Sequence, residues 1–193
     1  MLRRKGFTLV EMLIVIAIMA ILVFVAISSF TAARRSAKLD IAADSIVSEI
    51  RAMRSATKVG RVENVDDKVK CYGLLISKEE PYVRRMEMDY ASIKGNEADI
   101  CDASTVDYSV FESIEDLEIS EIEKFETDVN DVAIVFKPPF GDGLVAGKNL
   151  VFEDSIPSEK EIYINVSIPN RDETRIIKYN ALNGNVERLY VQQ

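Results

Sequence analysis

The feature that most constrains this chain is a long apolar segment close to its amino terminus. Between Phe7 and Phe30 the sequence has four polar side chains, and one of them, Glu11, is charged. As an α-helix this segment would be roughly 36 Å long, enough to cross the ~30 Å hydrocarbon core of a bilayer. Since neither proline nor glycine interrupts it, we predict a transmembrane helix over residues 7–30.

Basic residues flank this segment on both sides. The cations Arg3–Lys5 precede it, and Arg34, Arg35 and Lys38 follow it. A cationic cluster before a span favours retention of the amino terminus in the cytoplasm, although the second cluster weakens the asymmetry. We therefore expect the chain after about residue 31 to lie on the other side of the membrane.

The carboxylate of Glu11 is unusual in such a segment. An acid inside a membrane helix costs roughly 3 kcal/mol, so its presence indicates a function. Cleavage of the Gly6–Phe7 bond would create a new amine four residues before Glu11, and this amine is the partner we predict. The simpler alternative is that Glu11 reaches back to the membrane interface.

The stretch Lys5–Leu22, KGFTLVEMLIVIAIMAIL, resembles the amino-terminal signature of the type IV pilin and type II secretion pseudopilin superfamily. The resemblance implies that residues 1–6 are a leader peptide. It also implies that prepilin peptidase cuts between Gly6 and Phe7 and methylates the new amino group of Phe7. Glu11 takes the place of the acid in the mature helix of that family. From the pairing of its charge with the new amine, we predict that Glu11 fixes the axial register of subunits during assembly.

The same resemblance implies partners and a location. The partners would be prepilin peptidase, other pilin or pseudopilin subunits and an assembly platform in the inner membrane. The chain would cross the inner membrane once, with its head periplasmic or extracellular, and would enter a filament after assembly. The implied fold is α+β and pilin-like, with a long amino-terminal helix packed on an antiparallel β-sheet head.

The next segment, residues 31–58, is predicted to continue the helix with a different character. Apolar positions recur every three to five residues from Ala33 to Ala56, and charged residues occupy much of the rest. This pattern is typical of an amphipathic helix that packs one face on a domain. Gly60 is a plausible stop signal.

Residues 59–193 are predicted to form a β-rich head with one meander-like antiparallel sheet. Alternating or apolar runs predict strands, and turn residues separate them. The closing sequence, with Asn183-Gly184, predicts a hairpin. The predicted strands are Val69–Ile76, Tyr82–Tyr90, Val132–Phe136, Asn149–Phe152, Glu161–Ile168, Arg175–Tyr179 and Val186–Val191.

Two features of the head point weakly toward particular roles. The run VFKPPFGDG (Val135–Gly143) and the closing hairpin resemble the heads of minor pseudopilins and minor pilins.

Residues 96–131 are rich in acid and contain a single basic residue, Lys124. Calcium would suit such oxygens, but the spacing matches no known calcium loop, so we expect a solvated acidic face or a mobile insertion and no metal site.

The chain has two cysteines, Cys71 and Cys101, both in the predicted exported head. An even pair outside the cytoplasm favours a disulfide. The alternative is two buried free thiols.

Composition excludes several functions. Histidine is absent, which removes Ser-His-Asp and Cys-His catalysis and imidazole metal ligands. Residues 61–193 hold 15 basic and 28 acidic side chains, a net charge of −13, which disfavours nucleic acid. We expect neither enzymatic activity nor a cofactor.

The leading interpretation is a structural subunit of a type IV pilus or of a type II secretion-like pseudopilus. A second possibility is a membrane-tethered extracytoplasmic binding module that forms no filaments. A third is a secreted enzyme released by signal-peptide cleavage after Ser28.

Overall fold

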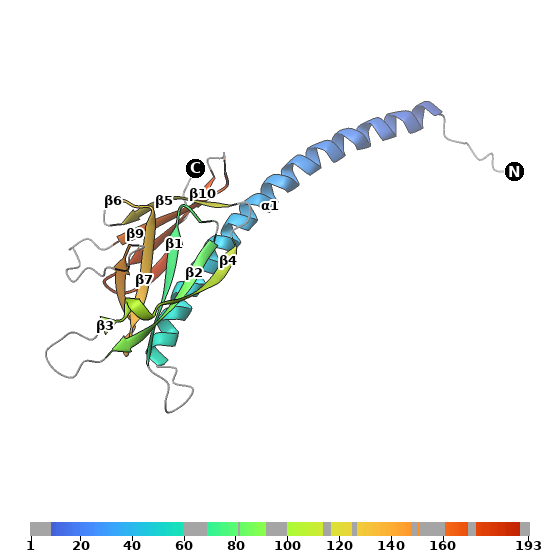
Figure 1. Ribbon diagram of the computed structural model, residues 1–193. Coiled ribbons are helices and arrows are strands. Elements are labelled where there is room, and N and C mark those ends of the chain that lie inside the picture. Colours follow the sequence, from blue (N-terminus) through green and yellow to red (C-terminus); the bar gives the residue numbers. More distant parts are fainter. Residues whose placement is uncertain are drawn as a thin grey trace. The chain divides into compact units, whose positions relative to one another are not determined.

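The protein has an α+β fold, in which one long helix precedes antiparallel β-sheets (Figure 1). A computed structural model describes residues 9–59, 69–80, 82–91, 100–113, 117–124, 127–147, 150, 161–169 and 173–189. By their contacts the residues group into two compact units, Met1–Lys38 and Leu39–Gln193. This arrangement confirms the predicted fold class.

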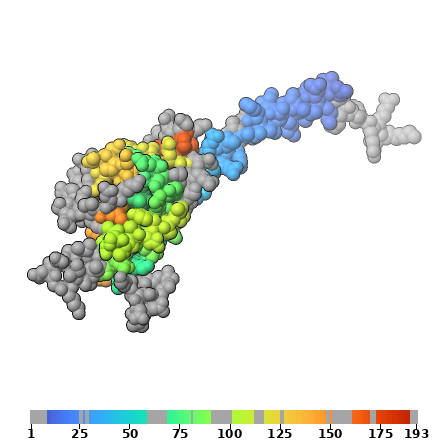
Figure 2. Space-filling model, viewed as in Figure 1, coloured from blue at the N-terminus to red at the C-terminus, as the bar shows by residue number. Residues whose placement is uncertain are grey.

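Helix α1 is a single element of 51 residues, Leu9–Val59. The predicted continuation of the helix through residues 31–58 is therefore present, and the helix ends just before Gly60, which lies outside the described residues. The described large apolar side chains from Leu9 to Phe30 are exposed. This part of the helix is blue in Figure 2. Within the described residues, no helix combines the length and the apolar character needed to cross a membrane. The predicted span also includes Phe7 and Thr8, which are not described.

The second unit contains two antiparallel sheets where one was expected. The first has six strands, in the order β3-β2-β1-β7-β8, with β4 also paired to β2. Its strands are β1 (Lys70–Ser77), β2 (Tyr82–Ala91), β3 (Ile100–Cys101), β4 (Asp107–Ser113), β7 (Asp131–Lys137) and β8 (Asp142–Ala146). A short 3₁₀ turn, Ala103–Thr105, lies between β3 and β4.

The second sheet has five strands, in the order β11-β10-β9-β5-β6. Its strands are β5 (Glu118–Lys124), β6 (Thr127–Asp128), β9 (Glu161–Ser167), β10 (Thr174–Asn180) and β11 (Asn185–Leu189). Every pair of neighbouring strands in both sheets is antiparallel.

The main hydrophobic core lies between the carboxyl half of α1 and the two sheets. The helix contributes buried apolar side chains from Leu39 to Ile50, spaced so that they share one face. The side chains of strand β7 belong to two hydrophobic cores, one on each face of the first sheet. Val132, Ile134 and Phe136 belong to the main core, whereas Ala133 and Val135 belong to a second core on the opposite face.

Six of the seven predicted strands are present with shifts of one or two residues at their ends. The exception is Asn149–Phe152, of which only Leu150 is described, and Leu150 is not in a strand. The acidic segment was predicted to be a solvated face or an insertion, and much of it forms β3, β4, β5 and β6. In β5 the apolar Ile119 and Ile122 are buried beneath exposed acids, so a strand face was present within the acidic composition.

Candidate assembly site and the attachment of the long helix

Of the residues predicted to act in processing and assembly, the structure describes Glu11. Gly6 and Phe7, the predicted cleavage and methylation residues, lie outside the described part of the chain. Glu11 lies in the first turn of α1, and its side chain is exposed. Main-chain amide groups of a first helical turn favour a nearby anion, so the helix itself supports a charged carboxylate here.

The helix that follows Glu11 is apolar on all sides. Its described large apolar side chains from Leu9 to Phe30 are between 50% and 80% exposed in the single chain. A helix of this composition is stable when apolar surroundings cover its whole circumference, as in a bilayer or a bundle of helices. The described large apolar side chains of this segment are exposed in the single chain.

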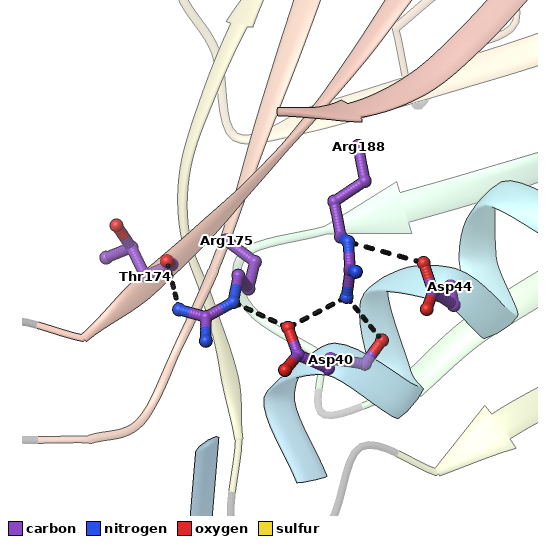
Figure 3. Close-up of polar contacts among 5 residues, drawn as sticks. All are labelled: Asp40, Asp44, Thr174, Arg175 and Arg188. Carbon is purple, nitrogen blue, oxygen red and sulfur yellow. Dashed lines mark hydrogen bonds and ion pairs between the residues drawn. The ribbon is translucent and has the colours of Figure 1, made fainter. Parts of the chain in front are cut away.

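The second part of α1 is attached to the head by charged side chains. Asp40 accepts hydrogen bonds from Arg175 Nε at 2.7 Å and from Arg188 Nη1 at 2.8 Å, both through Oδ1 (Figure 3). Arg188 Nε also lies 3.4 Å from Oδ1 of Asp44, one helical turn later. Two strands of the second sheet, β10 and β11, are thereby joined to the point where α1 enters the head.

A second charged pair joins α1 to the first sheet. Glu49 is buried and accepts a hydrogen bond from Nε of Arg85 on β2. The guanidinium of Arg85 also lies 4.8 Å from the ring centroid of Phe111 on β4. The hydrogen bond to Glu49 raises the pKa of Arg85 above its ordinary value, since it favours the charged form.

Two further arginines of α1 bind main-chain carbonyl groups at the last hairpin. Arg51 Nη2 donates to the carbonyl of Val186 at 2.7 Å, and Arg54 Nη1 donates to that of Gly184 at 2.9 Å. The part of α1 from Leu39 onward is thus fixed by packing and by hydrogen bonds to both sheets. The helix from Leu39 onward serves as part of the head.

Sequence reasoning missed these contacts. Asp40, Asp44, Glu49, Arg51 and Arg54 were assigned to the polar face of an amphipathic helix without partners. The partner strands lie more than 130 residues further along the chain for Asp40 and Arg51. Apart from the spacing of Asp40 and Asp44 on one helix face, the sequence holds no local signal for the pairing.

The two cysteines are bonded to each other. Cys71 on β1 and Cys101 on β3 form a disulfide with their Cα atoms 5.9 Å apart. Both residues are buried in the second core, so the bond ties the short edge strand β3 to the centre of the first sheet. In the described part of the chain, no group of three or more acidic or cysteine side chains is placed to hold a metal ion.

Comparison with protein families gives a match at the amino terminus. Residues 1–27 match the prokaryotic N-terminal methylation motif, which is the prepilin-type cleavage motif of type IV pilins and pseudopilins. The match confirms the resemblance predicted from Lys5–Leu22, and it supports a pilin- or pseudopilin-like precursor that prepilin peptidase processes. Comparison with curated proteins and with solved structures gave no match.

Proposed function

We propose that this protein is a structural subunit of a type IV pilus or of a type II secretion-like pseudopilus. One observation carries the proposal. The methylation motif of residues 1–27 includes the start of α1, whose described large apolar side chains are exposed from Leu9 to Phe30, and the core of the head begins only at Leu39. The chain therefore presents a folded head together with a helix that needs partners.

Before assembly, we infer, the apolar segment of residues 7–30 crosses the inner membrane. The cations of residues 3–5 then lie in the cytoplasm, where prepilin peptidase removes residues 1–6, and the head lies on the far side. After assembly the same side chains pack against helices of other subunits. Complete burial of one leucine or isoleucine side chain contributes roughly 1.5–3 kcal/mol, so either environment stabilises the segment strongly.

Glu11 and the amino group of Phe7 are proposed to set the axial register of neighbouring subunits. Each charge is costly in an apolar environment unless it is paired. Each mature subunit offers one amine and one carboxylate, so the amine of one subunit can meet Glu11 of the next. Such head-to-tail contacts do not close on themselves and produce open helical filaments.

The first experiment measures the amino terminus of the protein isolated from membranes. Mass spectrometry is expected to find a chain that begins at N-methyl-Phe7. A chain that retains residues 1–6 would favour the membrane-tethered binding module, and a start near Ser29 would favour the secreted enzyme. As a control, the Gly6→Ala precursor should accumulate uncut, while Ser28→Ala should be processed normally.

The second experiment separates assembly from processing. Glu11→Ala should be cut and methylated normally, but its incorporation into sheared filaments should fall by about tenfold or more, equivalent to ~1.4 kcal/mol per subunit contact. Ile16→Ala, which removes apolar surface without charge, serves as the comparison. Normal incorporation of the Glu11→Ala chain would contradict the register role.

A further inference from the structure

Two turns of the head, one from each sheet, are built alike. The turn between β7 and β8 is closed by the pair Lys137–Asp142, and the turn between β10 and β11 by Asn180–Asn185. Each turn ends in a glycine with positive φ, 70° at Gly141 and 63° at Gly184. Each glycine donates its N–H to the carbonyl four residues earlier, at 2.9 Å and 2.8 Å respectively.

Both turns contact the same arginine of α1. A Cβ atom placed on Gly184 would lie 2.7 Å from Cζ of Arg54. A Cβ atom placed on Gly141 would lie 3.2 Å from Cγ of Arg54 and 3.0 Å from Cε of Lys58. The two turns and the last turns of the helix therefore form one continuous surface. We call it the turn surface and define it as Arg54, Lys58, Lys137–Asp142 and Asn180–Asn185.

Each turn directs one large apolar side chain into solvent. Phe140 is 73% exposed and Leu182 is 60% exposed. Pro139, next to Phe140, is also exposed, whereas Pro138 and Ala181 are buried. A single exposed apolar residue is ordinary. Here two such residues lie on turns from different sheets, and both turns contact Arg54. Exposed apolar side chains beside an arginine are typical of the centre of a binding surface.

The charge of the turn surface is opposite to that of the head as a whole. It carries Arg54, Lys58 and Lys137 against one acid, Asp142, whereas residues 61–193 carry 15 basic and 28 acidic side chains, or −13. A complementary partner is therefore acidic. The β5–β6 hairpin offers the exposed carboxylates Glu118 and Glu121, together with Asp128, which is paired with Lys78 of the same head. The hairpin lies away from the end of α1 (Figure 1).

We propose that the turn surface binds the acidic β5–β6 side of the head of a second copy of this chain. The contact is head-to-tail, because the two surfaces lie at different places on one head, and it can repeat from copy to copy. This proposal rests on the proposed function, because it assumes a filament of these subunits. The contact would join the heads of neighbouring subunits, in addition to the contacts between their helices. Arg54 and Lys58 supply charge complementarity, and Phe140 and Leu182 supply the buried apolar area.

Site-specific photocrosslinking of the full-length protein in its membrane tests the contact. A photoreactive amino acid is placed at Phe140, at Leu182 and, as a matched control, at Val110, which is 63% exposed on β4. The first two positions should give a product of two chains whose crosslinked peptide lies within residues 118–128. An equal yield from Val110, a product with lipid alone, or a crosslink to another part of the second copy would overturn the proposal.

Variants define the chemistry of the contact. Phe140→Ser and Lys58→Glu should each lower the yield of the Leu182 crosslink by about tenfold, as expected of central interface residues. Phe140→Leu keeps an apolar side chain and should retain most of the yield. Unchanged yields in both disruptive variants would contradict the proposed contact.

The amino terminus of the same samples is analysed by mass spectrometry, so that the two proposals can fail separately. Filaments of chains that begin at N-methyl-Phe7 but lack the crosslink would refute the turn contact and leave the pilin-like function intact. Crosslinked chains that retain residues 1–6 in wild-type cells would refute the processing step and leave the turn contact intact.

Discussion

Arg188 on the last strand donates from one nitrogen to two oxygens of Asp40, 148 residues earlier: its Nη1 lies 2.8 Å from Oδ1 and 3.3 Å from the main-chain carbonyl oxygen. The side chain of Arg188 is 13% exposed and that of Asp40 is 38% exposed. The pair therefore lies partly out of water, where removal of one partner leaves a charge that is poorly solvated. It fixes strand β11 to the residue at which α1 enters the head.

Asp40→Ala is expected to destabilise the head by about 1–2 kcal/mol, because both Arg175 and Arg188 lose their shared acceptor. Asp44→Ala is the matched control, since Asp44 is 61% exposed and lies 3.4 Å from Arg188. It should cost less than about 0.5 kcal/mol. Denaturant unfolding of the full chain in a nonionic detergent measures both values, and equal losses would contradict the central role of Asp40.

The helix and most of the strands followed from local pattern. Ile162, Ile164 and Val166 alternate with more polar residues, and all three are buried in the main core. The exposed acids of β5 agree with the predicted solvated acidic face, but the strands of the acidic segment were not predicted, because composition was weighed above periodicity. Ile119 and Ile122 are three positions apart instead of two, since the strand register shifts between Ile119 and Glu121. An irregular strand of this kind breaks the alternation that sequence reasoning depends on.

The division into two sheets and the charged contacts of α1 could not be derived from sequence. Asp40 and Glu49 have no local feature that distinguishes them from solvated acids on a helix. Their partners are fixed by topology, which brings β2, β10 and β11 beside the helix. The methylation motif was recognisable because its residues are contiguous and its chemistry acts on a local segment.

The disulfide is expected to contribute strongly to the stability of the head. It closes a loop with a sequence separation of 30 residues, and loss of such a link costs about 3–4 kcal/mol in the chain-entropy description. A chain with both Cys71→Ala and Cys101→Ala should unfold at correspondingly lower denaturant concentration. Reductant should lower the stability of the wild-type chain toward that of the variant, and it should leave the variant unchanged.

The buried hydroxyl group of Tyr179 limits what Gly143 can be replaced with. A Cβ atom on Gly143 would lie 2.1 Å from the Tyr179 oxygen, although 3.4 Å from the ring carbon that bears it. Gly143→Ala should therefore cost about 1–3 kcal/mol through overpacking. In a Tyr179→Phe background the same substitution should cost much less, because the clashing oxygen is gone. A double-mutant cycle on denaturant unfolding measures the coupling, and additive losses would show that the clash is not the cause.

Tyr179 is also expected to make the protein sensitive to alkali. Burial raises the pKa of the Tyr179 phenol above its ordinary value near 10. The folded state therefore keeps the proton where the unfolded state loses it, so this contribution to stability is complete below pH 10 and declines as the pH rises above 10.

Tyr179→Phe cannot ionise. At pH 7 it should be as stable as wild type or up to about 1–2 kcal/mol more stable, since the hydroxyl has no hydrogen-bond partner among the described residues. The stability of the variant relative to wild type should then increase between pH 9.5 and pH 11. A constant difference over that range would show that Tyr179 ionises as readily in the folded head as in the unfolded chain.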